Sequence, residues 1–177
     1  MYRKSLWVLT TLIIVLPGVS EVVSTEGDAS TSNKGLTPMI DLSDIDGVRT
    51  HRPFLCAHRG GVISSDSPEC SLAAIRLAAE NGYRMVEIDA QETMDGEPVA
   101  FHDRSLTRSC GIDKKIRALT SSETSAILYR SSDQKIATLD EALALARSLN
   151  LWVMLDIKTT REPPNTEGFF IRIGELL

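Results

Sequence analysis

Apolar residues between positions 53 and 82 form a short run followed by a helical repeat. Residues 53–57 are almost entirely apolar and precede the string His-Arg-Gly-Gly, which predicts a buried strand that ends in a tight loop. Ser67 before Pro68 is typical of a helix N-terminus, with the serine as cap and the proline in the first helical position. Gly82 is typical of the C-terminal end of that helix. The pattern therefore predicts a strand and then a helix.

Apolar and acidic side chains then alternate over residues 85–89, which predicts a second strand. In such a strand Val86 and Ile88 point to one face, and Glu87 and Asp89 point to the other. The apolar pair requires a covering layer of helices. We therefore expect the acidic pair to face the interior of a closed sheet.

The segment after the second strand carries signals for a turn and a short helix. Asp95 and Gly96 indicate a turn, and residues 98–102 are expected to be extended after it. Thr120 and Glu123 have the spacing of a capping box, which predicts a helix N-terminus.

The last part of the chain predicts a helix, a strand and a further helix. Thr138 and Glu141 form a second capping box, and Asn150 is expected to end the helix that begins there. Residues 151–158 are an apolar strand with polar residues at its C-terminal end. Residues 169–177 predict the start of another helix.

Strands that alternate with helices predict parallel βαβ units. Polar side chains recur at the C-terminal ends of the predicted strands, which is where a (β/α)8 barrel of the TIM type carries its active site. These side chains are His58, Glu87, Asp89, Asp156 and Lys158. A complete barrel needs about 250 residues, so we expect an α/β barrel truncated after about three strands.

The acidic residues at the strand ends are the first candidates for chemistry. Two carboxylates on one face of an apolar strand are costly to bury without partners. Glu87 and Asp89 together suit a hard cation such as Mg²⁺ or Ca²⁺, and Asp156 is the natural third ligand. The alternative is a solvated pair of carboxylates on an exposed edge strand.

Two histidines follow two separate extended segments near the acidic pair. Either one alone is more often a structural histidine than a catalyst. Together, His58 and His102 could divide proton transfer at a phosphorus centre, with one deprotonating the nucleophile and the other protonating the leaving group.

The cations near these groups are candidate phosphate ligands. The guanidinium of Arg59 fits two phosphate oxygens, and Lys158 acts as a point charge. Both could equally be ion-pair partners of the acidic residues. Glu69 is expected in the first turn of a helix, where interaction with the helix dipole explains it as well as a role in the site does.

Composition and charge exclude some classes of function and leave others. The net charge of −5 provides no electrostatic footprint for nucleic acid. An acidic chain that handles a phosphodiester needs local cations or a metal at its site. The cysteines Cys56, Cys70 and Cys110 are too few for a disulfide framework, so we expect buried small residues with at most one bridge.

The N-terminal region has the pattern of a targeting segment. Residues 1–24 combine a basic start with an apolar run, which predicts a signal peptide or an uncleaved signal anchor. Residues 25–52 are expected to be a linker, and residues 53–177 a partial catalytic domain. The domain is then expected in the secretory lumen or outside the cell, with possible membrane association through the apolar segment.

Several motifs, taken together and in order, resemble the glycerophosphodiester phosphodiesterase family. They are Ala57-His58-Arg59-Gly60-Gly61, Pro68-Glu69, Val86-Glu87-Ile88-Asp89, the string from Thr93 to Val99, and His102-Asp103. The chain is most similar to the N-terminal part of the animal membrane-associated or luminal members, which include glycerophosphoinositol phosphodiesterases. It departs from most relatives at Cys70-Ser71, where they have Asn-Thr, and at Arg108-Ser109-Cys110, where they have Arg-Thr-Thr.

The resemblance implies a fold and a set of roles. The fold is a (β/α)8 barrel with a small insertion after the second strand, here about residues 93–120. His58 and His102 are the implied acid–base pair. Metal ligation is implied for Glu87, Asp89 and Asp156, and phosphate or substrate binding for Arg59, Lys158 and Glu69.

The implied activity is metal-dependent hydrolysis of glycerophosphodiesters, such as glycerophosphoinositol, -choline or -ethanolamine, in lipid metabolism. The cofactor is Mg²⁺ or Ca²⁺, and the partners are small molecules rather than nucleic acid. One alternative is a lysophospholipase D that acts on lysophospholipids or N-acyl lysophospholipids. A second is a catalytically incomplete fragment or pseudoenzyme.

Overall fold

The computed structural model describes residues 13–16, 44–50, 55–61, 63–130, 132–158 and 166–177. Its sheet consists of β1 (Ile13–Leu16), β2 (Cys56–Ala57), β3 (Met85–Glu92), β4 (Pro98–Ala100) and β5 (Trp152–Ile157). The helical segments are α1 (Ile45–Thr50), η1 (His58–Gly60), α2 (Leu72–Glu80), α3 (Thr107–Cys110), η2 (Ile116–Ala118), α4 (Ser121–Ser125), α5 (Leu139–Ser148) and α6 (Thr166–Leu176).

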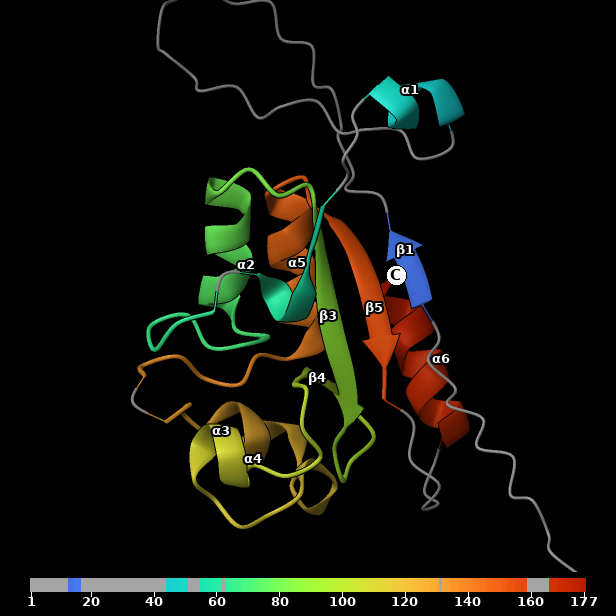
Figure 1. Cartoon of the computed structure of the whole chain (residues 1–177). Helices are drawn as coiled ribbons and strands as arrows, with labels where there is room; N and C mark the ends of the chain where they lie inside the picture. Colours follow the sequence, from blue (N-terminus) through green and yellow to red (C-terminus); the bar gives the residue numbers. More distant parts are fainter. Residues whose placement is uncertain (1–12, 17–43, 51–54, 62, 131, 159–165) are drawn as a thin grey trace, which may run out of the picture.

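Three neighbouring strands, β2, β3 and β5, run parallel and form the centre of the sheet. Helices α2 and α5 lie together beside β3, and α6 lies beside β5 (Figure 1); all three contribute residues to one apolar cluster with these strands. This arrangement confirms the predicted parallel βαβ units and the three barrel strands. The first strand is shorter than expected, because β2 contains only Cys56 and Ala57, while residues 53–54 lie outside the described residues.

The alternation predicted for β3 is confirmed by its packing. Val86 and Ile88 are fully buried in the main apolar cluster, which also contains residues of α2, α5 and β5. On the other face, Glu87 is 4% exposed and Asp89 is fully buried. The strand also continues past Asp89 to Glu92, where its last residues pair antiparallel with β4.

The start of α2 differs from the prediction. Ser71, and not Ser67, caps the helix, because the Ser71 hydroxyl accepts a hydrogen bond from the backbone N–H of Ala74 at 3.1 Å. A helix that began at Pro68 could not continue, since Cys70 has a left-handed backbone with φ of 58°. Pro68 and Glu69 therefore belong to a turn, and the helix-dipole interpretation of Glu69 is wrong.

The other predicted helix signals are confirmed. Both capping boxes are complete, at the N-termini of α4 and α5. Asn150 follows α5 with a left-handed φ of 53°, and Gly82 follows α2 with φ of 82°. The last helix, α6, begins at Thr166, three residues earlier than expected.

The insertion has an apolar core of its own, separate from the main cluster. Helices α3 and α4 lie below β4, at one end of the sheet (Figure 1). Its buried residues are Val99, Phe101, Leu106, Ile116, Leu119, Tyr129 and Ile136. This packing unit extends to Ile136, beyond the boundary expected at residue 120.

The N-terminal predictions lie mostly outside the described residues. Of residues 1–24, the structure describes Ile13–Leu16, which forms β1 and pairs antiparallel with β5. The expected linker, residues 25–52, contains the short helix α1. Among the described residues, no helix combines the length and apolarity required to cross a bilayer.

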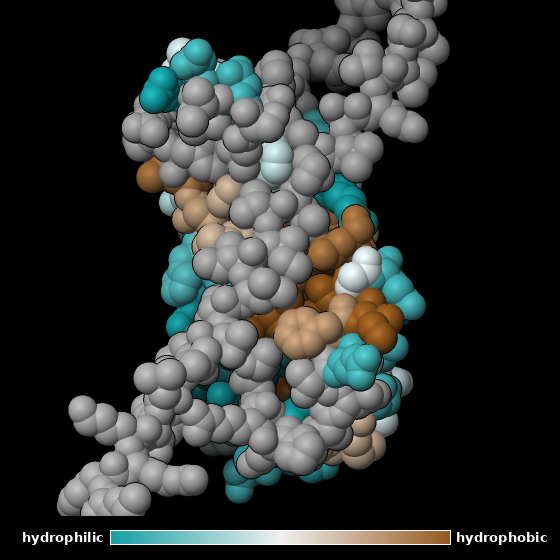
Figure 2. Space-filling model, turned by 90° about the vertical axis from the view of Figure 1, so that its right-hand side faces the viewer, coloured by the Kyte–Doolittle hydropathy of each residue, from teal (hydrophilic) through white to brown (hydrophobic). Residues whose placement is uncertain are grey.

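The cysteines are present as free thiols. None of the three, all of which the structure describes, forms a disulfide. Figure 2 shows apolar surface on the side of the molecule where β1 and α6 lie in Figure 1. Ile171 of α6 is among the exposed large apolar side chains.

Candidate active site

The parallel register of β3 and β5 places their acidic side chains next to each other. Asp89 and Asp156 are direct partners across the two strands, and Glu87 lies two residues before Asp89 on the same face. These three residues, which we call the acidic cluster, each offer one carboxylate oxygen that lies within 4.8 Å of the other two. The structure therefore brings together all three predicted metal ligands.

Burial and the repulsion between neighbouring carboxylates disfavour the charged form of Glu87 in the acidic cluster. Burial raises the pKa of Glu87 above its usual range, and the neighbouring charges of Asp89 and Asp156 raise it further. Oδ1 of Asp156 is buried and has no hydrogen-bond partner among the described residues. The cluster thus presents carboxylate oxygens whose charge is incompletely balanced by the protein.

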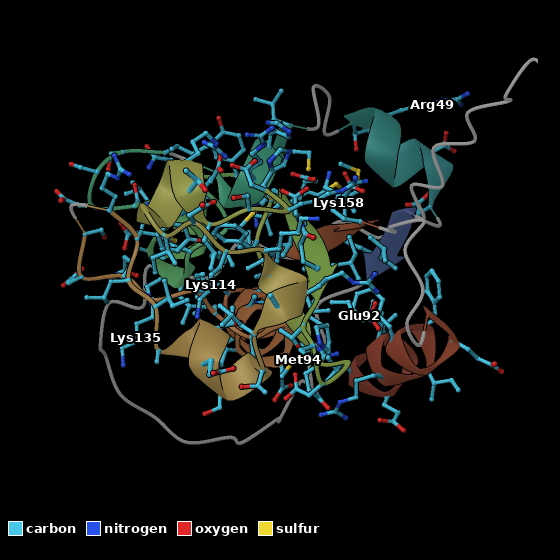
Figure 3. The ribbon with its side chains drawn as sticks, turned by 90° about the horizontal axis from the view of Figure 1, so that it is seen from below. Arg49, Glu92, Met94, Lys114, Lys135 and Lys158 are labelled. Carbon is cyan, nitrogen blue, oxygen red and sulfur yellow. The ribbon has the colours of Figure 1, made fainter. Side chains whose placement is uncertain are left out.

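Lys158 is the nearest cation to the acidic cluster. Figure 3 shows it just beyond the end of β5. Its Nζ lies 2.7 Å from Oδ1 of Asp89 and also bonds to Oδ2 of Asp156. Burial alone would lower the pKa of Lys158, but the two carboxylates outweigh burial and raise it. Lys158 is therefore held in its charged form.

The loop after β2 brings main-chain and side-chain groups to the same cluster. The backbone N–H of Arg59 donates to Oε2 of Glu87 at 2.7 Å, and Nε2 of His58 lies 4.0 Å from the same oxygen. Arg59 has a left-handed backbone, with φ of 56°, which turns the chain sharply at this point. The His58 side chain is 72% exposed and thus accessible to a ligand.

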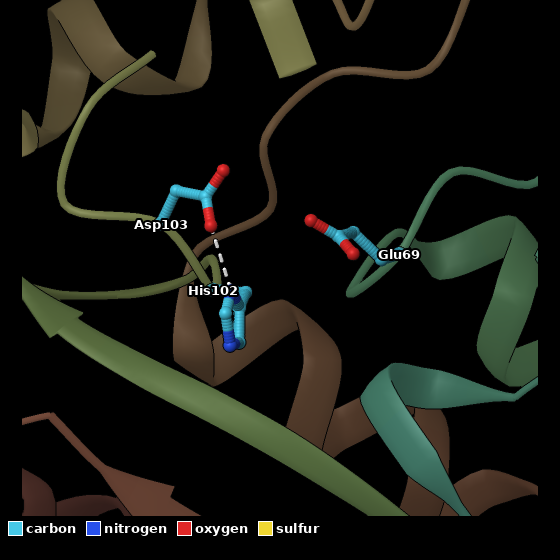
Figure 4. Close-up of side chains that lie close together, drawn as sticks. All are labelled: Glu69, His102 and Asp103. Atoms are coloured by element: carbon cyan, nitrogen blue, oxygen red, sulfur yellow. Dashed lines mark hydrogen bonds and ion pairs between the residues drawn. The ribbon is translucent and has the colours of Figure 1, made fainter. Parts of the chain in front are cut away.

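A second group of side chains surrounds His102. Figure 4 shows His102, Asp103 and Glu69 converging from two different segments of the chain. Nδ1 of His102 lies 2.7 Å from Oδ1 of Asp103, and Nε2 of His102 lies 2.8 Å from a guanidinium nitrogen of Arg59. The Arg59 guanidinium also donates to Oε2 of Glu69 at 2.9 Å. Arg59 therefore links the second group to the acidic cluster.

Four residues of the site were not among the sequence-based candidates. Asp103 accepts from His102, and Arg108 bonds to both Asp103 and Glu69. The side-chain amide of Gln91 donates to the backbone carbonyl of His102 at 2.7 Å. The thiol of Cys70 donates to Oδ2 of Asp89 at 3.3 Å. Asp103 lies within the His102-Asp103 motif that carried the family resemblance, which was the available signal for it, whereas Arg108 lies in a string noted as a departure from the family.

The arrangement provides the parts required for phosphoryl chemistry. The acidic cluster offers hard oxygen donors of the kind that Mg²⁺ and Ca²⁺ prefer. Two cations, Arg59 and Lys158, lie beside it. Two imidazoles stand near these groups, one exposed to solvent and one held by an acidic partner. Such a set can bind an anion, neutralise charge and transfer protons.

Comparison with known proteins agrees with this geometry. Over 110 residues the chain is 41% identical to glycerophosphodiester phosphodiesterase 1 of Homo sapiens, a match that covers 58% of this chain and 33% of the relative. It is 28% identical over 149 residues to a glycerophosphoinositol inositolphosphodiesterase of Mus musculus, covering 67% of this chain and 27% of that one. The chain thus spans about a third of the length of these curated relatives.

A solved structure with the same architecture is a phosphodiesterase of Oleispira antarctica in complex with the product sn-glycerol-3-phosphate. It matches with a TM-score of 0.60 and 28% identity, over 70% of this chain and 51% of that one. The family model described as "Glycerophosphoryl diester phosphodiesterase family" matches residues 58–168. The expected family is confirmed, and animal members are among the relatives. The chain belongs to the glycerophosphoryl diester phosphodiesterase family.

Proposed function

We propose that this chain provides the catalytic groups for metal-dependent hydrolysis of glycerophosphodiesters to an alcohol and a phosphomonoester. The observation that carries the proposal is the acidic cluster at the ends of parallel strands, where each residue offers one oxygen that lies within 4.8 Å of the other two. Family membership and the named activities of the relatives support the same reaction class. The products are glycerol 3-phosphate and an alcohol, or glycerol and a head-group phosphate.

The residues of the acidic cluster fit a divalent cation. Their donors are carboxylate oxygens, and the raised pKa of Glu87 reflects burial and like charges that a cation would offset. The buried Oδ1 of Asp156, which lacks a partner among the described residues, is a further free donor. Mg²⁺ or Ca²⁺ bound there would supply Lewis-acid polarisation of a phosphate oxygen.

Each remaining candidate has a distinct task in the proposed reaction. Arg59 and Lys158 bind the phosphate and stabilise the charge that develops on it. His58 and His102 exchange protons with the nucleophile and the leaving alkoxide. Glu69 acts indirectly, because its carboxylate holds the guanidinium of Arg59.

The printed names of the relatives support a proposal for the substrate class. The mouse relative is named for glycerophosphoinositol, and the Oleispira antarctica enzyme was solved with sn-glycerol-3-phosphate. We therefore place the substrate among water-soluble glycerophosphodiesters derived from membrane lipids. This assignment gives the chain a role in lipid metabolism.

An assay of the full 177-residue chain tests the proposal. Turnover of glycerophosphoinositol is measured with Mg²⁺, with Ca²⁺ and with a chelator. We expect metal-dependent release of inositol or inositol phosphate, and nearly complete loss of turnover in His102→Ala. His51→Ala is the matched control, since no role is assigned to His51. Turnover in the presence of the chelator, or a His102→Ala variant as active as the wild type, would contradict the proposal.

Localisation in the secretory pathway is a separate proposal, which rests on the signal-like pattern of residues 1–24. Expression in animal cells should place the domain in the secretory lumen or in the medium. N-terminal sequencing of the product would show whether the segment is removed or kept as an anchor. Recovery of the protein in the cytosol would contradict this proposal.

A further inference from the structure

Five side chains around His102 close into a continuous ring of hydrogen bonds and ion pairs. Its members, which we call the side-chain ring, are Arg59, Glu69, Arg108, Asp103 and His102 in order of contact. Arg59 donates to Glu69 at 2.9 Å and to Nε2 of His102 at 2.8 Å. Asp103 and His102 are 2.7 Å apart. Arg108 closes the ring between the two carboxylates.

Arg108 occupies the position where two separate segments meet. Its Nε donates to Oδ2 of Asp103 at 2.5 Å, and a terminal guanidinium nitrogen bonds to Oε1 of Glu69. Glu69 precedes α2, whereas Asp103 follows β4, so the guanidinium bridges the barrel and the insertion. A planar guanidinium has several fixed donors, so it can engage the two carboxylates through different nitrogens.

The helix that carries Arg108 is fixed to the core of the insertion. Leu106, the N-cap residue of α3, is fully buried, and its carbonyl accepts from the N–H of Cys110 at 2.8 Å. The Arg108 side chain extends from this anchored turn toward the site and remains 56% exposed. Because the guanidinium side of both ion pairs is exposed, solvent screens them and reduces their contribution to stability. Their effect is on orientation.

The partners of His102 determine where its proton lies. A guanidinium has donors but no acceptor, so Nε2 of His102 must accept from Arg59. An ionised carboxylate accepts only, so Nδ1 must donate to Asp103. The ring therefore holds His102 neutral with its proton on Nδ1. The basic nitrogen, Nε2, faces the guanidinium that is proposed to bind phosphate.

We propose that Arg108 is a positioning residue that fixes the proton of His102 on Nδ1 and aligns Arg59, by holding the Asp103 and Glu69 carboxylates. Asp103 keeps its charge and its rotamer because Arg108 bonds to it. The Glu69 carboxylate binds the guanidinium groups of both Arg59 and Arg108. Glu69 therefore orients Arg59 while part of its charge is directed to Arg108. When phosphate arrives, Arg59 can leave Nε2 of His102, which then becomes free to take a proton.

The effect on turnover rests on the proposed function, but the position of the proton does not. Two-bond ¹H–¹⁵N correlation spectra of the histidine rings report the tautomer directly, and the signal of His102 is assigned by its loss in His102→Gln. In the wild-type chain we expect His102 with its proton on Nδ1. In Arg108→Gln we expect a mixture that contains the Nε2–H form. In Asp103→Ala the acceptor for Nδ1–H is lost while Arg59 still faces Nε2, so the preference for the Nδ1–H form should weaken relative to the wild type.

Matched variants separate positioning from a general loss of structure. Arg104→Gln removes an exposed arginine from the same loop and should leave the tautomer of His102 unchanged. Arg108→Lys keeps the charge but replaces the separate donors of the guanidinium by a single nitrogen, so it cannot hold Asp103 and Glu69 in the same geometry and its spectrum should resemble that of Arg108→Gln. All three arginine variants should stay within about 3 °C of the wild-type Tm. An Arg108→Gln chain that folds and keeps the wild-type tautomer would overturn the proposal.

Kinetics provide the second measurement. Arg108→Gln should lower kcat through His102 and raise KM through Arg59, with kcat/KM falling about tenfold or more. Arg104→Gln should match the wild type in both parameters. If the wild-type chain shows no turnover, the proposed function fails while the tautomer measurement still decides the role of Arg108. If the wild type is active and Arg108→Gln keeps full kcat/KM, the proposed role of Arg108 fails alone.

Discussion

The thiol of Cys70 donates a hydrogen bond to Oδ2 of Asp89, with Sγ 3.3 Å from the oxygen. The left-handed backbone of Cys70, with φ of 58°, accompanies the placement of its side chain against the acidic cluster. Burial raises the pKa of this thiol well above its usual range, and the charge of Asp89 adds to the effect. The raised pKa favours the protonated thiol, which is the form that donates the hydrogen bond to Asp89.

The first prediction concerns thiol reactivity. Because the thiolate is the reactive form, a raised pKa slows labelling. Burial raises the pKa of Cys56 to about 11 and that of Cys110 to about 11. At pH 8 all three cysteines should react with a thiol reagent far more slowly than free cysteine, and Cys70 should be the slowest. Mass spectrometry of the labelled native protein measures this order, with urea-unfolded protein as the control. Rapid labelling of Cys70 in the native state would contradict it.

The second prediction concerns the charge balance of the acidic cluster. Glu87→Gln keeps an oxygen acceptor for the backbone N–H of Arg59 and removes one of three adjacent charges. We expect the metal-free variant to equal or exceed the wild-type stability, by up to about 1 kcal/mol, which corresponds to a Tm higher by about 2–4 °C.

The same variant should lose the stabilisation that a bound cation provides. Addition of Mg²⁺ or Ca²⁺ should raise the Tm of the wild type, because a ligand that binds only the native state stabilises it. The Tm of Glu87→Gln should respond weakly or not at all. Differential scanning fluorimetry with and without chelator measures both effects, and equal metal responses in the two proteins would contradict the ligand assignment.

The third prediction concerns the packed face of β3. Ile88 is fully buried in the main apolar cluster, so Ile88→Ala should lower the free energy of unfolding by about 2–5 kcal/mol. Ile63 is 51% exposed, and Ile63→Ala should change it by no more than about 0.5 kcal/mol. Urea denaturation followed by tryptophan fluorescence compares the two variants. Similar losses at both positions would show that the packing of β3 is not as described.

The fourth prediction concerns acid stability. The hydrogen bond from Arg108 lowers the pKa of Asp103 below its usual value of 3.8, and the bond from His102 lowers it further, although burial opposes both. An acid with a depressed folded-state pKa stabilises the protein fully above its unfolded pKa. That contribution is lost as the pH falls through the folded value.

The free energy of unfolding should therefore decline more steeply below about pH 4 in the wild type than in Asp103→Asn. Urea denaturation curves recorded at several pH values between 3 and 6 test this difference. Above pH 6 the wild type should be more stable than Asp103→Asn. Parallel pH profiles for the two proteins would rule out Asp103 as the responsible group.

Local patterns were sufficient to predict much of the fold and the acidic cluster. The alternation from Val86 to Asp89 depends only on the two-residue period of a strand, which is independent of tertiary context. The parallel direction of β3 and β5, which brings the carboxyl ends with Asp89 and Asp156 to one edge, follows from βαβ connectivity. The alternation was predictable because it is encoded within a few consecutive residues, and the meeting of the two aspartates because both lie at the carboxyl ends of predicted parallel strands.

The remaining features depend on contacts between distant segments. Arg108 and Glu69 are separated by 39 positions, and no local period indicates that they meet. Because Cys70 has a left-handed backbone, the helix is capped by Ser71 and not by Ser67, although Ser67 followed by Pro68 is the stronger sequence pattern for a helix N-terminus. The core of the insertion runs to Ile136 because apolar residues on both sides of the expected boundary share one interior.

Arg59 serves two parts of the site through two different kinds of atom. Its backbone N–H binds Glu87, while its guanidinium belongs to the side-chain ring. Saturation mutagenesis at position 59 would remove the guanidinium from every product. The backbone N–H would be absent only from the proline product, and β-branched products would be strained at the left-handed φ of 56°. Fitness scores from such a library would therefore underestimate the importance of position 59, since most variants keep the hydrogen bond from the backbone N–H to Glu87.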